Sequence, residues 1–116
     1  PTPAPTAPPT SASAAPPSVR DDAENGPRAI LEPRSRTDAW WVHRHESFNR
    51  RAREGAERGD IDLIFLGDSI TQGWEGAGKA VWEKHFVPRR AVNFGIGADR
   101  TQHVLYRIRN GNLDAL

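Results

Sequence analysis

Residues 62–74, DLIFLGDSITQGW, decide how the rest of this sequence is interpreted. The stretch opens on an apolar run with β-branched and aromatic members, so Ile61–Leu66 is predicted to be a strand. Because this run is apolar on both faces, it suits the interior of a parallel sheet. It stops at Gly67, Asp68 and Ser69. Those residues are typical of a turn, but they also suit a serine nucleophile held where a strand passes into a helix.

Hydrophobic spacing on either side of that stretch predicts three helices and a second strand. Trp41, His45, Phe48 and Ala52 recur at spacings of four, three and four, which gives one apolar stripe on a helix. The expected elements are, in order, a helix at Thr37–Arg58, the strand at Ile61–Leu66, a helix at Gly78–Phe86, a strand at Arg90–Gly95 and a helix at Thr101–Asn110. Strands that alternate with helices indicate a parallel sheet, so the predicted fold class is α/β.

Caps and apolar positions make these predictions more specific. Thr37 or Asp38 can cap the start of the first helix, and Gly55 and Gly59 mark its fraying end. The first of the two later helices is expected to bury Val81, Trp82 and Phe86. The second is amphipathic and places Val104, Leu105 and Ile108 together, with Gly111 at its C′ position. Two strands and three helices cannot cover both faces of a sheet or close its edges. We therefore expect the sequence to be the front part of a larger α/β domain.

The first 36 residues differ in composition from the rest. Residues 1–18 hold seven of the ten prolines and carry no charge, so we expect an extended linker there. Residues 19–36 are polar with one small apolar patch, and we expect them to be a lead-in to the domain. The predicted organisation is a largely disordered linker and lead-in at residues 1–36 and a folded part at residues 37–116. A Pro/Ala/Thr-rich start is common after a removed export signal, which favours an exported protein.

Charge and composition narrow the classes of function. The net charge is +1 and the charges are mixed in sign, so nucleic acid is not an expected partner. The chain has no cysteine, which excludes disulfides, thiolate metal sites and cysteine catalysis. No apolar run reaches the ~20 residues that a membrane helix needs. His43 and His45 face different sides of the predicted helix, and no metal or cofactor is expected. The oligomeric state cannot be predicted from the sequence.

A glycine-rich loop follows the second predicted strand. Residues 94–101, FGIGADRT, lead directly into the last helix. Gly95 and Gly97 permit tight turns, and backbone N–H groups in such a loop can point at an anion. Because the carboxyl ends of parallel strands meet at one edge of a sheet, this loop is expected beside Ser69. A serine hydroxyl next to free amides is the arrangement that acyl transfer needs.

Three blocks of the sequence resemble the GDSL/SGNH hydrolases. The blocks are IFLGDSITQGW at residues 64–74, AVNFGIGADRTQHVLYRIRNGNL at residues 91–113, and the helix WWVHRHESFNRRAREG at residues 40–55. Within that family, the chain is most similar to the branch of the platelet-activating-factor acetylhydrolase catalytic subunits. The resemblance covers roughly residues 38–116. It implies a flavodoxin-like three-layer α/β/α sandwich and hydrolysis of small, often acetyl, esters without a metal.

The resemblance also assigns site residues. Ser69 matches the nucleophile, and its own backbone N–H matches one oxyanion donor. Ala98 stands where the family's GIGGD pattern has its last glycine, the second backbone donor. If that position needs a positive φ, the alanine Cβ costs ~1–2 kcal/mol. The residues expected to support the site are Gly67, Asp68, Asn93, Gly95 and Gly97, and Gln72 and Trp74 are candidates for lining the acyl pocket.

Two blocks of the family do not occur in this sequence. They are the third, which supplies an oxyanion-hole asparagine, and the fifth, which supplies an Asp-x-x-His pair. The catalytic Asp and His are therefore expected on chain beyond residue 116. His103 is the one local candidate for a base, although a partly buried helix residue is the commoner role for such a histidine.

The predicted function is a serine esterase or acylhydrolase whose partner is a small ester substrate. The first alternative is a truncated, inactive fragment that acts at most as a binding or assembly piece. The second alternative is a surface-attached or carbohydrate-binding module.

Overall fold

The computed structural model describes residues 26–116, which fall into two compact units. The first unit ends at Leu31, and its described part contains the short 3-10 turn Ala29–Leu31. The second unit runs from Glu32 to Leu116. The linker expected at residues 1–18 lies outside the described residues, and the domain boundary at residue 36 stays a prediction. The fold and the site described below belong to the second unit.

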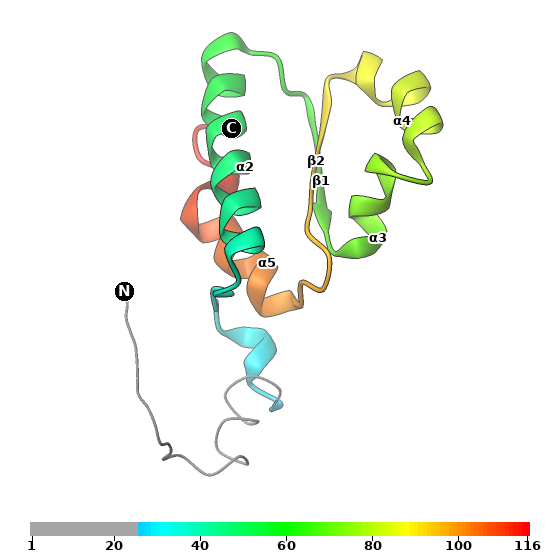
Figure 1. Cartoon of the computed structure of the whole chain (residues 1–116). Helices are drawn as coiled ribbons and strands as arrows, with labels where there is room; N and C mark the ends of the chain where they lie inside the picture. The colour runs from blue at the N-terminus through cyan, green and yellow to red at the C-terminus, as the bar shows by residue number, and fades with distance from the viewer. Residues whose placement is uncertain (1–25) are drawn as a thin grey trace. The chain divides into compact units, whose positions relative to one another are not determined.

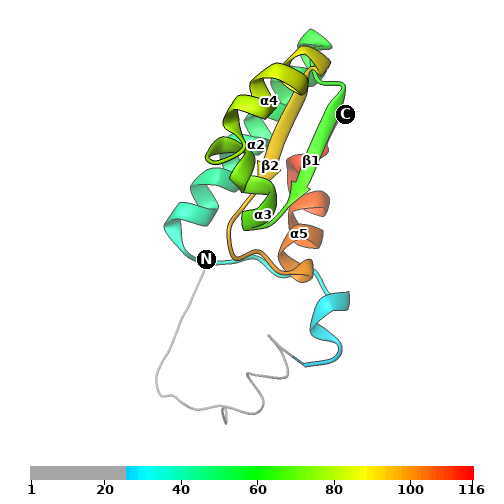
Figure 2. The ribbon, with the colours of Figure 1, turned by 90° about the vertical axis from the view of Figure 1, so that its right-hand side faces the viewer.

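The second unit is a three-layer α/β structure built on two parallel strands (Figure 1). Its main elements are α2 (Ala39–Arg58), β1 (Leu63–Gly67), α3 (Ser69–Gln72), α4 (Lys79–His85), β2 (Ala91–Gly95) and α5 (Thr101–Arg107). Short turns connect or follow them: η2 (Gly73–Glu75), η3 (Val87–Arg89) and η4 (Ile108–Asn112). Helices α2 and α5 lie on one face of the sheet, and α3 and α4 lie on the other, as Figures 1 and 2 show. The predicted α/β class is confirmed.

The register of the sheet brings the ends of both strands to the same level. Leu63 of β1 pairs with Ala91 of β2, and the pairing runs in step to Gly67 and Gly95. Both carboxyl ends therefore open at one edge of the sheet. Helix α3 begins directly after one of them, and the loop to α5 begins directly after the other.

Helix α2 has the N-cap, the terminal Gly59 and the buried stripe that the sequence predicts, but Gly55, also expected at its fraying end, lies buried inside the helix. Asp38 is its N-cap and accepts a hydrogen bond from the backbone N–H of Trp41, and Gly59 ends the helix with φ 64°. A left-handed φ of this kind suits glycine because it has no Cβ. The stripe residues Trp41, His45, Phe48 and Ala52 are all buried.

Each face of the sheet has its own apolar cluster. On the α2 face, Phe48 stacks on Phe94 with ring centroids 4.6 Å apart, and Trp41, Ala52 and Ile96 complete the buried core. On the other face, four half-buried aromatic rings pack edge to face or tilted: Phe65, Trp74, Trp82 and Phe86. The prediction for Val81 is wrong, because its side chain is 49% exposed. Trp82 and Phe86 are four residues apart and share one face of α4, whereas Val81 is rotated about 100° from it.

The last helix differs most from its prediction. It ends at Arg107, and the chain continues through a π-type turn in which Asn110 and Gly111 leave helical geometry. Its buried residues are Gln102, His103 and Arg107. The apolar residues that the sequence groups together are not fully buried: Val104 and Leu105 are half-buried and Ile108 is 36% exposed. The buried Arg107 binds groups at the ends of the strands instead.

Arg107 is completely buried and binds groups from four parts of the chain. Its Nε donates to Asp99 Oδ2 at 2.9 Å, and neither side chain is exposed to solvent. Its Nη1 donates to the carbonyl of Phe94 at 2.7 Å and to Asn112 Oδ1 at 2.8 Å, and its Nη2 donates to the carbonyl of Gly67 at 3.2 Å. Burial lowers the pKa of the guanidinium, and the Asp99 carboxylate opposes that shift. One side chain therefore joins the ends of both strands to the turn after α5.

Replacing Arg107 tests this role. We expect Arg107→Met to lower the free energy of unfolding by about 3–5 kcal/mol, because it leaves a buried carboxylate without its buried partner. Urea denaturation followed by circular dichroism measures the change. Arg109→Gln, an exposed neighbour on the same segment, is the control and should change stability by no more than about 0.5 kcal/mol. Equal stabilities for the two variants would show that the buried pair does not hold the fold.

His45 is a second buried polar residue whose environment has a consequence for pH. Its ring stacks on Trp41 at 5.0 Å, and its ring nitrogens lie near the side-chain amides of Asn49 and Asn112. Burial is the main cause that lowers its pKa from the ordinary 6.5, and the positive charge of Arg107 adds to that effect. The folded protein therefore holds His45 neutral at a pH where the unfolded chain would already bind a proton.

Stability should consequently fall as the pH falls below about 6.5, the pKa of an unperturbed histidine. Because the unfolded state binds the extra proton, the loss begins at that value and continues down to the lowered pKa of the folded state. Urea melts at pH 7.5 and pH 5.5 measure it, and His45→Gln should reduce the difference. His43→Gln, exposed on the same helix, should keep the wild-type difference. The same pH dependence in both variants would contradict the assignment.

Candidate active site

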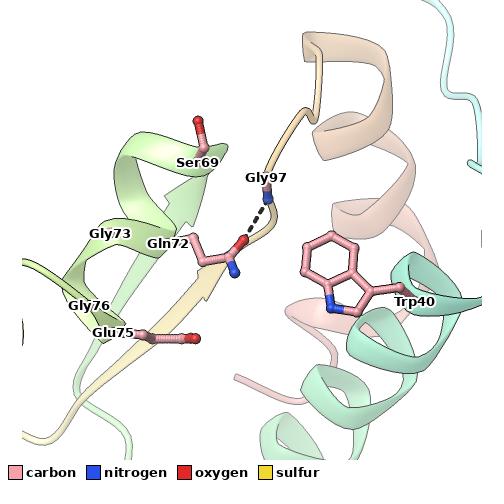
Figure 3. A pocket seen from close by; sticks show the side chains of 7 residues that line it. All are labelled: Trp40, Ser69, Gln72, Gly73, Glu75, Gly76 and Gly97. Carbon is pink, nitrogen blue, oxygen red and sulfur yellow. Dashed lines mark hydrogen bonds between the residues drawn. The ribbon is translucent and has the colours of Figure 1, made fainter.

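An open cavity lies at the edge of the sheet where both strands end. It measures about 580 Å³ and is lined by Trp40, Ser69, Gln72, Gly73, Glu75, Gly76 and Gly97. Figure 3 shows that these residues come from three places: the start of α2, the segment from α3 to Gly76, and the loop after β2. The cavity thus contains the serine that follows the first strand and part of the glycine-rich loop that follows the second.

Ser69 is the first residue of α3, and its side chain is exposed. Asp68 caps this short helix, since its Oδ1 accepts a hydrogen bond from the backbone N–H of Ile70 at 2.9 Å. Among residues 26–116, no group accepts a hydrogen bond from the backbone N–H of Ser69, and none pairs with its hydroxyl. Both groups are therefore available to a ligand in the cavity.

Glycines at the ends of both strands let α3 rest directly on the sheet. A Cβ at Gly95 would lie 2.6 Å from the backbone nitrogen of Gln72, and a Cβ at Gly67 would collide with the side chain of Thr71. Asn93 adds two hydrogen bonds of 2.8 Å, one from its Nδ2 to the carbonyl of Thr71 and one from the N–H of Gly95 to its Oδ1. These contacts fix where the helix that begins with Ser69 lies relative to β2.

The loop after β2 is held by side chains from both sides. Gln72 Oε1 accepts the N–H of Gly97 at 2.7 Å, the contact drawn in Figure 3. Arg36 Nη1 donates to the carbonyl of Gly97 at 2.7 Å and to Asp99 Oδ1 at 2.9 Å. A Cβ built on Gly97 would lie 3.7 Å from the Cβ of Ser69, so the loop passes next to the serine.

Ala98 is the strained residue of this loop. Its φ is 68°, whereas Gly95 and Gly97 are not among the described residues with a positive φ. Ala98 is exposed, and within residues 26–116 nothing accepts a hydrogen bond from its N–H. From the sequence, Gly95 and Gly97 were expected to permit the tight turns of this loop. In the structure, the residue with the left-handed backbone conformation is Ala98. That conformation costs an L-residue ~1–2 kcal/mol.

Ala98, His103 and Trp74 were considered from sequence but are not among the residues that line the cavity, although Gly97, the neighbour of Ala98, is. His103 is buried, and its Nδ1 accepts the backbone N–H of Arg100 at 2.9 Å, so this ring nitrogen helps to cap α5. Trp74 packs in the aromatic cluster on the α4 face instead. Gln72, the other candidate for lining the pocket, does line it.

Sequence reasoning missed several residues around the cavity. Trp40 and Glu75 line it, and Arg44 connects their elements by donating to Glu75 Oε2 at 3.1 Å and to the carbonyl of Gly95 at 2.7 Å. Arg36 and Asp99 hold the loop. The only signal for Arg107 and its partner was a charged residue between apolar positions of a predicted amphipathic helix. In residues 26–116 there is no cluster of three or more histidine or acidic residues suited to a metal ion.

The fold and the cavity define the chain as part of an α/β protein with a serine at the carboxyl end of a parallel strand. Over 77 residues it is 36% identical to the platelet-activating factor acetylhydrolase IB subunit alpha1 of Rattus norvegicus and of Homo sapiens. It is equally similar to the subunit alpha2 of Homo sapiens. Each match covers 66% of this chain and 31% of the relative, so the chain spans about a third of the length of these curated relatives.

These matches support a partial and distant relationship to that kind of hydrolase. No protein-family model matches the chain. Within the part that the structure describes, no helix is long and apolar enough to cross a membrane.

The strain at Ala98 can be measured directly. We expect Ala98→Gly to raise the free energy of unfolding by up to about 1 kcal/mol, because glycine adopts a positive φ without a Cβ clash but loses more entropy on folding. Ala80→Gly, on the exposed side of α4, should do the opposite and cost about 0.5–1 kcal/mol. Urea denaturation of both variants provides the comparison. A loss of stability in Ala98→Gly would show that the loop gains nothing from glycine.

Proposed function

We propose that Ser69 is the nucleophile of an SGNH-type serine acylhydrolase that cleaves small esters, with acetyl esters as the favoured class. The observation that carries this proposal is that a serine whose hydroxyl and backbone N–H have no partner among residues 26–116 lies in an open cavity at the carboxyl ends of two parallel strands. The names of the relatives, which are acetylhydrolase subunits, support the acyl class.

The proposed reaction uses Ser69, which lines the cavity, and the N–H of Ala98, which follows the lining residue Gly97. Ser69 Oγ attacks the ester carbonyl carbon, and the carbonyl oxygen takes up negative charge. The N–H groups of Ser69 and Ala98 donate hydrogen bonds to that oxygen and stabilise the tetrahedral intermediate. The intermediate then releases the alcohol, and water hydrolyses the acyl-serine. Gly67, Asp68, Asn93, Gly95 and Gly97 support this arrangement through the close packing of α3 and the loop.

A serine needs a base to accept its proton. His103 is a poor candidate because its Nδ1 caps α5 and its side chain does not line the cavity. In this proposal the base is the histidine of an Asp-x-x-His pair on chain beyond residue 116, and an asparagine side chain from the same region completes the oxyanion hole. The serine and two amides of the site thus come from the sequence described here.

Ser69→Ala tests the nucleophile. In the protein that carries the whole domain, we expect kcat/KM for p-nitrophenyl acetate to fall by on the order of 10⁴-fold or more. A fluorophosphonate probe should label the wild type at Ser69 and should not label the variant. Ser47→Ala, which removes another serine hydroxyl of the described domain, is the matched control and should keep the wild-type rate. Turnover that survives the loss of Ser69 would refute the proposal, and a protein with no esterase activity would favour the alternative of a binding piece.

A further inference from the structure

The peptide group between Gly97 and Ala98 lies in a chain of hydrogen bonds that begins outside the cavity. The carbonyl of Gly97 accepts from Arg36 Nη1 at 2.7 Å, while the N–H of the same residue donates to Gln72 Oε1 at 2.7 Å. These two contacts hold the backbone immediately before Ala98 from two sides. Arg36 lies 61 residues earlier in the sequence, in the segment that leads into α2.

Because the peptide bond is planar, the contact of Arg36 with the Gly97 carbonyl also determines the direction of the Ala98 N–H. In a trans peptide the C=O of one residue and the N–H of the next point in opposite directions. The bond from Arg36 to the Gly97 carbonyl therefore fixes the direction of the Ala98 N–H, which points away from the guanidinium. A charged donor on the carbonyl also polarises the peptide group, which strengthens its N–H as a donor.

Arg36 is itself held in place. Its Nε pairs with Asp38 at 3.1 Å, its Nη1 pairs with Asp99 at 2.9 Å, and its side chain is only 17% exposed. Asp99 is fully buried and also accepts from Trp41 Nε1 at 2.8 Å and from Arg107. The Nη1 that binds the loop is thus anchored to the buried Asp99, so it can impose a direction on the loop.

We infer that Arg36 is a positioning residue that sets the Ala98 N–H as an oxyanion donor. The inference rests on the proposed function of Ser69 and explains how an alanine serves at a left-handed position. The arginine holds the carbonyl, Gln72 holds the preceding N–H, and the strained conformation at Ala98 is thereby kept. Arg36 contacts no substrate in this scheme and acts only through the peptide group that it orients.

The first test reads the peptide group without any reaction. The amide ¹⁵N resonance of Ala98 responds to a hydrogen bond on the preceding carbonyl, so Arg36→Gln should shift it. Arg36→Lys, which keeps a charged donor, should restore part of the shift. Asp38→Asn is the control, because Asp38 binds Nε and Nη2 of Arg36 whereas Nη1 makes the contact with Gly97, and because asparagine can still cap α2. It should leave the Ala98 resonance close to that of the wild type.

Two outcomes of that test would overturn the inference. One is an Ala98 resonance that does not move in Arg36→Gln. The other is a shift confined to the indole N–H of Trp41 and the amide of Asp99, which would mean that Arg36 serves only to neutralise the buried carboxylate. Retention of the remaining amide pattern establishes that each variant is folded.

The second test is kinetic and uses p-nitrophenyl acetate with the protein that carries the whole domain. An oriented donor acts on the transition state more than on the bound ester, so Arg36→Gln should lower kcat about 10- to 100-fold and change KM little. Arg36→Lys should recover part of kcat, and Asp38→Asn should keep it. An unchanged kcat, or a change in KM alone, would refute the positioning role. Failure of the proposed function appears separately, as activity that does not depend on Ser69.

Discussion

The ion pair between Asp99 and Arg107 is the constraint on which the rest of this structure depends. Burying a charged group costs several kcal/mol, and this cost is offset only when nearly all of its hydrogen-bonding positions have partners. Here the carboxylate accepts from Arg36, Trp41 and Arg107, and the guanidinium binds three further oxygens. Two of those oxygens are backbone carbonyls at or near the ends of β1 and β2. The cost of burying Arg107 is therefore offset in part by its hydrogen bonds to backbone carbonyls at the ends of the strands.

The same pair explains how elements distant in sequence meet at the cavity. Asp99 follows β2 by a few residues, Arg36 and Trp41 flank the start of α2, and Arg107 ends α5. A change in the position of any one of these elements would leave a buried polar group without a partner, which costs about 1–3 kcal/mol or more for a charged group. The loop that carries Ala98 is therefore confined by polar contacts. On the other face of the sheet, α3 and α4 pack through backbone contacts and aromatic rings.

Local patterns in the sequence were enough to predict the order of the elements. The spacing of Trp41, Phe48 and Ala52 located α2, and a β-branched apolar run located β1, because both features follow from the periods of helix and strand. Periodicity failed for α5, since it assigns a charged residue such as Arg107 to solvent. It also misplaced Val81, which lies in a helix of only seven residues where one position changes the face.

The candidate site was predictable only where the topology of the sheet determines which residues meet. Ser69 and Ala98 follow the ends of two parallel strands, and topology alone brings such positions together. The contacts that Arg36 and Gln72 make with Gly97 depend on residues 61 and 25 positions away, which no local pattern contains. The sequence could show what a positive φ at Ala98 would cost but not that it occurs, because an alanine does not indicate a positive φ.

The paired glycines at the end of the sheet have a consequence for what sets the position of the serine. Gly67 and Gly95 lie opposite each other, so the last rung of the sheet carries no side chain, and α3 rests on bare backbone. The distance from the serine to the sheet is thus set by main-chain atoms that mutation cannot enlarge or shrink gradually. The side chains of the aromatic cluster on the α4 face do not form this contact. The position of the serine relative to the sheet therefore depends on the two glycines rather than on the side chains that fill the core.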